Sequence, residues 1–427
     1  MGLLSCKNRR HAAAANGETM TSTHRPYRLA VVASHPIQYQ APLFRALAAR
    51  PEIDLTVLFC GDWGLESYDD KGFGRELKWD VPLLDGYRSE FLPNVSPKPS
   101  PSRFWGLINP GVVRRLRAGR FDALWMHGWA KFTDWLAMLT AFASGVPVLL
   151  RGETTLLPRL PAWKIMAKRA ILTQLFRRVS AFLAIGRYNA EFYQAYGVPK
   201  EKIFHVPYTV DNDFFLAQAE RYLPEKIALK RMVGIPDDLP VILFCGKLTA
   251  VKRPLDLLKA FGEVSRTMPA GLVYAGDGPL RLQLEAYVRE HHLQHVYFMG
   301  FQNQTELPRF YAVADVFVLP SGFEPWGLVI NEAMCFGLPV VVSDQVGAGG
   351  DLVEDGVNGF MYPVGEVITL AEQLAVLLTE TTLARKMGQG SREIICRWSQ
   401  REAIQGILAC LENLERHCGL TDLDIKI

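Results

Sequence analysis

The chain has 427 residues, of which 49% are hydrophobic and 21% are charged, a composition typical of a globular protein with large cores. This length predicts two or three domains. The net charge of +3 is too small to indicate nucleic acid as a partner, and the seven cysteines include no CxxC pair of the zinc or thioredoxin type. No run of eighteen apolar residues occurs, so we expect no membrane-spanning helix.

Residues 1–25 are polar and alanine-rich and lack the apolar segment of a secretory signal. The start MGLLSC differs from a myristoylation motif, because Cys6 stands where serine or threonine is required. We therefore predict a disordered tail over 1–25, with Met20 as an alternative start, and a second tail over 417–427. Cys60 and Cys245 end apolar runs, which favours buried free thiols in a cytoplasmic protein.

Continuous apolar runs of strand length recur along the chain, most of them followed by a helical pattern. Such runs predict strands that are buried on both faces, as in parallel sheets. They lie at 29–33, 55–60, 123–126, 148–150, 181–185 and 203–206, and then at 241–245, 271–274, 296–299, 316–319 and 340–342. The alternation of strands and helices predicts an α/β protein with two doubly wound, Rossmann-like domains that face each other across a cleft.

We place the N-terminal domain at 26–207 and the C-terminal domain at 239–391. A linker over 208–238 contains prolines, charges and one helix at 224–233. The last helical stretch, 392–416, either caps the second domain or crosses back to the first.

A basic stretch from 154 to 189 contains no aspartate or glutamate. Lysines and arginines alternate there with apolar residues, which predicts a basic amphipathic helix over about 159–178. Such a helix fits an anionic membrane surface, at the inner face of which the protein would be peripheral. It equally fits a helix that packs on the core and presents a solvated basic face.

In the first half, polar side chains follow the predicted strands. The turn SHPIQYQ after the first strand offers His35, Gln38 and Tyr39 and is no GxGxxG fingerprint, which disfavours a nicotinamide dinucleotide. His127 ends a later strand, and Arg151 follows the next one. Ligands of open α/β sheets bind at such carboxyl ends. A purely structural role is the alternative for each of these residues.

In the second half, cations and glycines follow the strands. Gly246 and Lys247 come directly after one strand, and Lys252 precedes a proline suited to the first turn of a helix, which predicts a diphosphate site. The next strand is followed by Gly276, Asp277 and Gly278, which allow a ligand to approach the backbone closely. Solvated lysines and an ordinary turn are the alternatives.

The stretch GFEPWGLVINEAM, residues 322–334, contains Glu324 and Glu332. We predict a helix that begins at about Pro325 and ends near Gly337, with both glutamates on about the same side. The amides of Trp326, Gly327 and Leu328 would then lie at the positive end of the helix. The alternative is an N-cap glutamate followed by a solvated one.

In this order, GKLTAVKRP, AGDGP, the two glutamates, GLPVVVSD and VEDGVNGF resemble the family 4 retaining glycosyltransferases (glycosyl transferases group 1), which have the GT-B fold. The resemblance continues more loosely upstream, through 184–215. It implies a nucleotide-diphospho-sugar donor held by the C-terminal domain, an acceptor held by the N-terminal domain, and a last helix that crosses back. It implies no cofactor beyond the donor and no metal.

Carried over by position, the resemblance assigns a role to each matched residue. Lys247 and Lys252 bind the diphosphate, Glu324 binds the transferred sugar, and Glu332 binds the ribose. The glycine-rich segments, Asp277 and the amides of residues 326–328 complete the donor site. His127 lies near the reacting carbon and, with Lys252 and Glu324, forms the catalytic set. The expected acceptor-binding residues come from their position after the predicted strands and not from this carry-over; they are His35, Gln38, Tyr39 and Arg151.

The resemblance implies retention of anomeric configuration by front-face attack. Together with the basic helix, it favours transfer to a glycan or lipid-linked acceptor in cell-surface polysaccharide or glycolipid biosynthesis. The alternatives are a cytosolic glucosyltransferase with a small soluble acceptor and a non-catalytic module that binds nucleotide sugars. Two departures stand out: HPIQYQ replaces the family's glycine-rich loop, and Trp326 replaces a phenylalanine.

Overall fold

The computed structural model describes residues 25–70, 72–158 and 161–418, so the tails expected at 1–25 and 417–427 lie almost wholly outside the described residues. The described chain forms two compact units. The N-terminal unit contains residues 25–68, 82–208 and 400–418, and the C-terminal unit contains residues 69–81 and 209–399, apart from residue 71.

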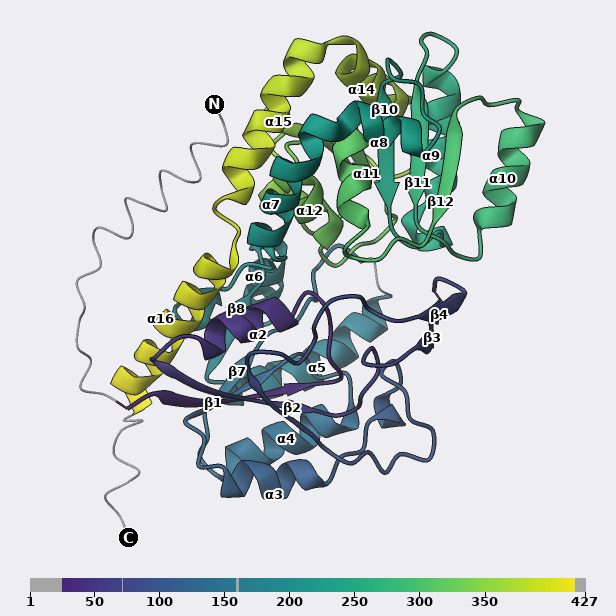
Figure 1. The fold of residues 1–427 in the computed structure, drawn as a ribbon. Helices are drawn as coiled ribbons and strands as arrows, with labels where there is room; N and C mark the ends of the chain where they lie inside the picture. Colours follow the sequence, from purple (N-terminus) through teal and green to yellow (C-terminus); the bar gives the residue numbers. More distant parts are fainter. Residues whose placement is uncertain (1–24, 71, 159–160, 419–427) are drawn as a thin grey trace. The chain divides into compact units, whose positions relative to one another are not determined.

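A parallel sheet is the centre of the N-terminal unit. Its strands are β1 (Tyr27–Ala33), β2 (Ile53–Phe59), β5 (Arg88–Phe91), β6 (Ala123–Met126), β7 (Val148–Leu150), β8 (Ala181–Ala184) and β9 (Ile203–His205). Over the described residues their order is β5-β2-β1-β6-β7-β8-β9. Figure 1 labels β1, β2, β7 and β8 of this sheet. The chain order reverses at β1, which pairs with β2 on one side and β6 on the other. The carboxyl ends of β1 and β6 therefore border a topological switch point, where ligands bind in open α/β sheets.

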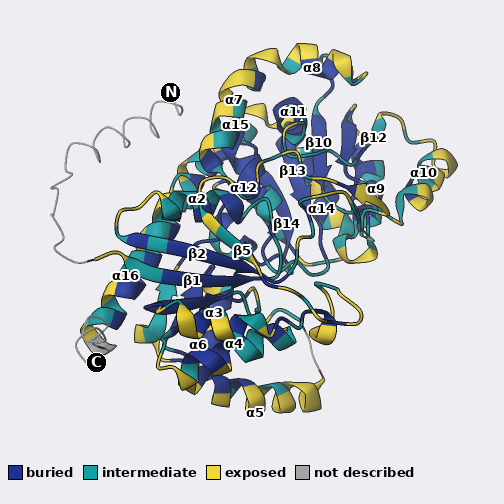
Figure 2. Ribbon diagram, turned by 60° about the horizontal axis from the view of Figure 1, so that its bottom comes forward, coloured by how far each residue is buried: buried dark blue, intermediate teal, exposed yellow. Residues whose placement is uncertain are grey.

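Helices cover both faces of this sheet. They are α2 (Ala41–Ala48), α3 (Gly111–Ala118), α4 (Phe132–Ala143), α5 (Ala162–Arg178), α6 (Arg187–Ala195) and α16 (Gln400–Cys418), with short 3-10 turns η1 (Phe104–Gly106) and η2 (Lys200–Lys202). One core contains side chains of α2 and α16, and the other contains side chains of α3, α4, α5 and α6. The strands between them are buried, as Figure 2 shows for β1 and β2. Cys60 is a buried free thiol there.

A second parallel sheet is the centre of the C-terminal unit. Its strands are β10 (Val241–Cys245), β11 (Gly271–Ala275), β12 (Val296–Gly300), β13 (Val316–Leu319), β14 (Val340–Ser343) and β15 (Gly359–Tyr362). Within the described chain their order is β12-β11-β10-β13-β14-β15. Cys245, at the end of β10, is a buried free thiol. The two parallel sheets confirm the predicted doubly wound α/β class.

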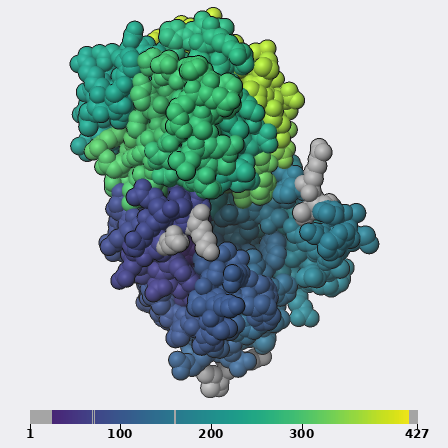
Figure 3. Space-filling model, turned by 90° about the vertical axis from the view of Figure 1, so that its right-hand side faces the viewer, coloured from purple at the N-terminus to yellow at the C-terminus, as the bar shows by residue number. Residues whose placement is uncertain are grey.

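The helices of this unit are α7 (Asn212–Tyr222), α8 (Lys226–Met232), α9 (Pro254–Val264), α10 (Arg281–Glu290), α11 (Leu307–Val313), α12 (Leu328–Cys335), α13 (Gly349–Leu352), α14 (Val367–Thr379) and α15 (Thr381–Ile395), with 3-10 turns η3 (Leu223–Glu225) and η4 (Ala250–Lys252). α9 packs against α14, and α7 packs against α11 and α12. Figure 3 shows the surface of this unit in teal to green, with its last helices in yellow.

Three segments differ from the expected organisation. Residues 209–238 are not an extended linker, because α7, η3 and α8 pack within the C-terminal unit. The stretch 392–416 is not one helix: α15 ends at Ile395, and α16 begins at Gln400 and belongs to the N-terminal unit. Residues 69–81, placed by sequence in the first domain, belong to the C-terminal unit, where β3 (Tyr68–Asp70) and β4 (Arg75–Leu77) form a separate two-stranded sheet.

Among the described residues, no single helix is long and apolar enough to cross a membrane. The bent pair formed by α14 and the helical stretch after it, 381–416, meets that criterion jointly, by length and composition only.

Candidate functional site

One candidate site lies at the strand ends of the C-terminal unit. Gly246 and Lys247 follow β10, and Gly276 to Gly278 follow β11. The two turns are in direct contact: the Gly246 amide donates to the Ala275 carbonyl at 3.1 Å, and a Cβ added to Gly276 would lie 1.9 Å from the Gly246 oxygen. Glycine at 276 is therefore explained by backbone packing as well as by access for a ligand. The Asp277 carboxylate is engaged by Arg281, 3.2 Å away.

Lys252 and Glu324, which the sequence places 72 residues apart, form an ion pair. Lys252 ends η4, and Glu324 lies in the loop between β13 and α12. The side chains are 22% and 13% exposed, so the pair is shielded from water yet reachable. Burial, with a smaller effect of Lys247, lowers the pKa of Lys252 to about 8. A diphosphate could replace Glu324 as the partner of Lys252, and sugar hydroxyls could replace Lys252 as the partner of Glu324.

The helix after Glu324 starts later than predicted. α12 begins at Leu328, and its N-cap, Gly327, has a φ of 102° in the left-handed region. Pro325 and Trp326 are therefore not helical, which corrects the expected start at Pro325. A Cβ on Gly327 would also lie 2.9 Å from a Leu319 methyl group, so glycine is required there on two grounds. The first amides of α12 have no acceptor within the helix and are suited to an anion.

The side chain of Trp326 does not face a ligand. It is 3% exposed, its indole N–H donates to Asn331 at 3.0 Å, and its ring packs 5.3 Å from that of Trp398. Replacement of the family's phenylalanine by tryptophan is therefore accommodated in the core, and only the backbone of Trp326 can contact a donor.

Glu332 lies one helical turn into α12 and is 9% exposed. It accepts a hydrogen bond from the Tyr311 hydroxyl at 2.7 Å. Burial raises the pKa of its carboxyl to about 7, although the Tyr311 hydrogen bond opposes this shift. The carboxyl therefore titrates closer to neutral pH than an ordinary glutamate does, and Tyr311 is its hydrogen-bond partner in the core. The solvated alternative for Glu332 does not hold.

A second candidate site is a pocket of about 320 Å³ in the N-terminal unit. It opens at the carboxyl ends of β1, β6 and β7, at the switch point of the sheet. Its walls combine polar and aromatic side chains. The lining residues are Ser34, Ile37, Tyr39, Gln40, His127, Gly128, Trp129, Ala130, Arg151, Gly152, Glu153, Thr154, Ile185 and Tyr208.

His127 is a neutral imidazole in this pocket. Burial, reinforced by the Arg151 charge, lowers its pKa to about 3. The ring stacks on Trp125 with centroids 5.0 Å apart. Gln40 Nε2 lies 3.5 Å from Nδ1, at the distance limit of a hydrogen bond, and the tautomer of the ring decides which of the two atoms donates. The Nε2 atom of His127 is buried and has no partner among the described residues, so it is available to a ligand hydroxyl.

Arg151 lies beneath the pocket rather than at its mouth. Its side chain is 4% exposed, donates to the Pro207 carbonyl at 3.2 Å, and stacks 5.0 Å from the Tyr208 ring. Tyr208 in turn donates to the Glu153 carboxylate and packs edge-on against Tyr39. Arg151 thus holds Tyr208, which orients Glu153 at the wall.

Two of the residues expected to face the acceptor do not line this pocket. His35 Nδ1 forms a hydrogen bond of 2.9 Å with the Ser34 hydroxyl, and its ring packs against Trp63. Burial lowers the pKa of His35 to about 4. Gln38 is partly buried next to it in the same turn. Glu153 and Tyr208 line the pocket but were not among the residues predicted from the sequence. Each of them closely follows a predicted strand, and this position could have identified them.

Two family models match the chain: residues 225–394 match "Glycosyl transferases group 1", and residues 36–209 match "Glycosyl transferase 4-like domain". An uncharacterized glycosyltransferase of Methanocaldococcus jannaschii is 42% identical over 141 residues, 33% of this chain and 36% of that protein. The alpha-D-kanosaminyltransferase of Streptomyces kanamyceticus is 29% identical over 248 residues, 57% of this chain and 62% of that protein. The matched part thus spans less than two thirds of each curated relative.

A crystal structure of HepE from Anabaena, in complex with UDP and glucose, superposes with a TM-score of 0.67 and 19% identity over 91% of this chain and 100% of that one. This likeness shows a two-domain α/β fold of the GT-B type. The two matched models together cover the strands of both sheets except β1. The chain belongs to the family 4, group 1 glycosyltransferases.

Proposed function

We propose that this protein is a retaining, metal-independent glycosyltransferase that moves a sugar from a nucleotide-diphospho-sugar to an acceptor. The observation that carries the proposal is the buried pair of Lys252 and Glu324, with Lys247 and the start of α12 at the same strand ends. Two cations and a helix N-terminus suit a diphosphate, and a carboxylate beside them suits sugar hydroxyls. The family membership supports the same assignment.

The chemistry follows from these groups. The diphosphate replaces Glu324 as the partner of Lys252, and the released carboxylate accepts hydrogen bonds from the sugar. The acceptor hydroxyl attacks the anomeric carbon on the face from which the diphosphate departs. The bond from carbon to the acceptor oxygen forms, the bond to the diphosphate breaks, and the departing phosphate oxygen takes the acceptor proton. Lys247 and Lys252 stabilise the developing charge, the task a metal ion has in other phosphate enzymes.

In the N-terminal unit, the pocket around His127 is the proposed acceptor site. The neutral imidazole donates from Nε2 to a hydroxyl near the reacting carbon. Glu153, oriented by Tyr208, accepts from an acceptor hydroxyl. A uridine nucleotide is the first donor to test, because HepE is described in complex with UDP.

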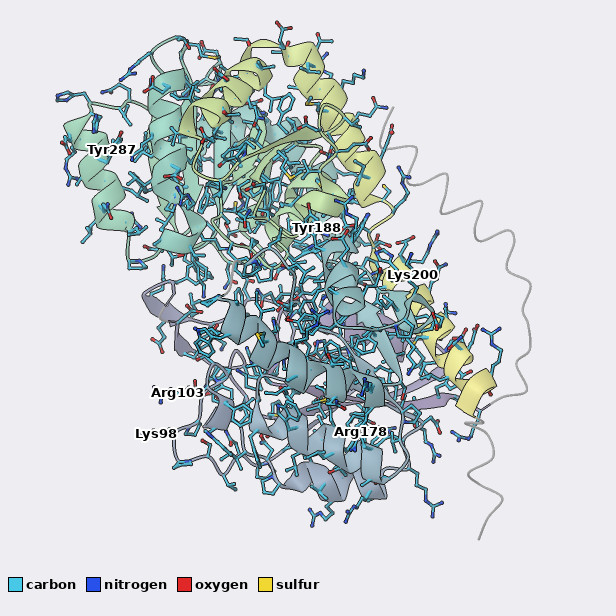
Figure 4. All side chains as sticks on the ribbon, turned by 180° about the vertical axis from the view of Figure 1, so that it is seen from behind. Lys98, Arg103, Arg178, Tyr188, Lys200 and Tyr287 are labelled. Atoms are coloured by element: carbon cyan, nitrogen blue, oxygen red, sulfur yellow. The ribbon has the colours of Figure 1, made fainter. Side chains whose placement is uncertain are left out.

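A role in cell-surface polysaccharide or glycolipid assembly, at the inner face of the membrane, is supported by α5. Its first half exposes Trp163, Ile165 and Met166, while its buried side chains, Leu172 and Phe176 among them, lie in the second half. Arg178 ends this helix, as Figure 4 shows. Exposed apolar and basic side chains on one helix favour an anionic lipid surface and a lipid-linked or glycan acceptor.

Figure 4 also labels Lys98 and Arg103, which lie in the loop before η1 of the same unit. They border an apolar hollow whose Trp105 is 61% exposed. This loop repeats the combination of aromatic and basic side chains found on α5, which adds support for a membrane surface as partner.

The alternatives remain distinguishable. A cytosolic enzyme with a small soluble acceptor would turn over without lipid and would not bind vesicles. A non-catalytic module would bind a nucleotide sugar without hydrolysing or transferring it. The presence of the full set of Lys247, Lys252, Glu324 and Glu332 favours an enzyme, because a module that no longer catalyses transfer would be expected to lose part of it.

The test is donor turnover. UDP-, GDP- and ADP-sugars are incubated with the purified chain, with and without EDTA, and nucleotide release is measured. We expect one donor class to be turned over equally in EDTA, and Lys252→Ala to lower kcat/KM by about 100-fold or more. Lys259→Ala, an exposed lysine on α9, is the control and should leave turnover unchanged.

Glu324→Gln should abolish transfer while nucleotide binding persists, because the substitution removes the sugar ligand and frees Lys252. Full turnover by either the Lys252 or the Glu324 variant would contradict the proposal, as would donor binding without any turnover.

A further inference from the structure

The segment 69–81 reaches the donor residues of the C-terminal unit. In the sequence, this segment lies between β2 and β5. It contains the short β3–β4 sheet, whose strands are labelled in Figure 1. Although its sequence neighbours on both sides belong to the N-terminal unit, the segment itself is part of the C-terminal unit. It carries one acidic side chain to the lysine that follows β10.

That side chain is Asp70. Both of its carboxylate oxygens accept hydrogen bonds from Lys247 Nζ, at 2.9 and 3.0 Å. The amides of Gly72 and Phe73 donate to the same carboxylate at 2.8 and 3.0 Å, and the side chain is 15% exposed. Burial acts to raise the pKa of Asp70, but the Lys247 and amide hydrogen bonds outweigh it and hold the pKa below its ordinary value. Asp70 is thus an ionised carboxylate with a built set of donors.

The environment of Lys247 is completed by the same segment. Its ammonium lies 4.8 Å from the centroid of the Phe73 ring. A Cβ on Gly72 would lie 2.6 Å from Lys247 Cδ, so the backbone passes directly against the lysine side chain. Lys247 is therefore in contact with the Asp70 carboxylate, the Phe73 ring and the backbone at Gly72, and not with the carboxylate alone.

Further contacts hold the segment on the loop after β12. Phe73 packs edge-on against Phe301 with centroids 4.8 Å apart, and Trp79 packs against the same ring at 6.2 Å. Asn303 donates to the Lys78 carbonyl at 2.7 Å. Because the loops after β10 and β12 are both engaged, the segment lies across strand ends of this sheet.

We propose that Asp70 is a placeholder for the donor phosphate. In the free protein its carboxylate accepts hydrogen bonds from the Lys247 ammonium, and the diphosphate must displace this carboxylate to bind. The inference rests on the proposed function, which assigns the diphosphate to Lys247. A carboxylate and a phosphate are both anions that present oxygens to the same ammonium, so they compete for it. Donor binding is thereby coupled to movement of the 69–81 segment away from Lys247.

The structural alternative is that Asp70 only shapes its own turn. Asp70→Asn separates the two roles, because the asparagine oxygen can still accept from the Gly72 and Phe73 amides while the negative charge is removed. Under the placeholder role, this variant binds nucleoside diphosphates more tightly. Under a purely structural role, its affinity is unchanged or lower.

The experiment is calorimetric titration with UDP, GDP and ADP, and with uridine, guanosine and adenosine as uncharged controls. We expect Asp70→Asn to tighten binding of the preferred diphosphate roughly fivefold, a modest factor because Lys247 is 37% exposed and solvent screens the pair. Nucleoside affinity should not change. Glu76→Gln removes the same charge from an exposed position of the same segment and should have no effect.

Coupling to the lysine is checked in a Lys247→Ala background, where Asp70→Asn should lose its effect. An equal or weaker diphosphate affinity in Asp70→Asn, or a gain that persists without Lys247, overturns the inference while leaving the proposed function intact. Two other outcomes overturn the assignment of the diphosphate to Lys247, and the inference with it. One is that neither the natural chain nor Asp70→Asn binds a diphosphate, and the other is that Lys247→Ala leaves diphosphate affinity unchanged.

Discussion

At the scale of single residues, burial shifts the pKa values of Glu332 and Lys252 in opposite directions. Burial disfavours the charged form of each, which raises the pKa of Glu332 to about 7 and lowers that of Lys252 to about 8. A donor that needs the Glu332 carboxylate for its ribose and the Lys252 ammonium for its phosphate requires both groups charged. Both are charged together only in a narrow range around pH 7 to 8.

We therefore expect the affinity for the donor sugar nucleotide to rise as pH increases through about 7 and to fall above about 8. The dissociation constant of UDP-glucose, which has no titrating phosphate in this range, measures this directly. Glu332→Gln should remove the rise through pH 7 and keep the fall above pH 8. An unaltered lower limb in Glu332→Gln would show that another group controls it.

The same carboxyl affects stability with a defined sign. Its pKa in the folded chain lies above the ordinary value of 4.5, so the folded state binds more protons than the unfolded state between about pH 4.5 and 7. The contribution is fully present below pH 4.5 and is lost as pH rises through about 7. Glu332→Gln should accordingly gain stability relative to the natural chain as pH rises across this window.

At the scale of elements, α12 and α5 show how far local patterns extend. The pattern predicted a helix after Glu324, and a helix is present, but its start at Leu328 depends on the left-handed Gly327 and its contact with Leu319. A proline is permitted in the first turn of a helix. No local feature of the sequence shows that Pro325 and Trp326 lie in a turn before the helix and not in its first turn. For α5, charge and apolar spacing predicted the helix, while the packing decided which apolar residues are exposed.

The exposed residues of α5 allow a direct test of membrane binding. We expect the protein to sediment with vesicles of equal parts phosphatidylcholine and phosphatidylglycerol, and Trp163→Ser combined with Met166→Ser to weaken this by at least about tenfold through loss of apolar burial. Met232→Ser on α8 is the matched control, since Met166 and Met232 are each 72% exposed.

Lys168 and Arg169 are poor targets for this test. Lys168 lies 4.8 Å from the Phe192 ring, and Arg169 donates to the Ala195 carbonyl, so both stabilise packing on α6. Vesicle binding that survives the loss of Trp163 and Met166 would show that another surface binds the membrane. Absence of vesicle binding by the natural chain would argue for the soluble-acceptor alternative.

At the scale of the whole molecule, the chain does not divide at a single boundary. Residues 69–81 leave the N-terminal unit for the C-terminal one, and α16 returns from the C-terminal unit to the N-terminal one. Ala403, Ile407 and Leu411 of α16 are fully buried in the core that also contains Leu29 and Val31 of β1. The last helix is therefore a structural part of the first sheet.

Leu411→Ala should lower the free energy of unfolding of the N-terminal unit by about 3 kcal/mol, because it leaves a cavity in this core. Hydrogen exchange followed by mass spectrometry should show faster exchange in β1 and β2, with β10 and β13 unchanged. Glu412→Ala, an exposed neighbour, is the control. Equal loss of protection in both units would mean that they unfold as one.

The sequence was sufficient for the class of fold, the position of most strands and the family, because continuous apolar runs and the spacing of glycines, lysines and glutamates are local properties. The tertiary structure was needed to show that Lys247 meets Asp70, that Lys252 meets Glu324, that Glu332 meets Tyr311, and that Trp326 packs on Trp398. These pairs join residues on separate elements, and such contacts are decided by which strands and helices pack together. No local pattern specifies them.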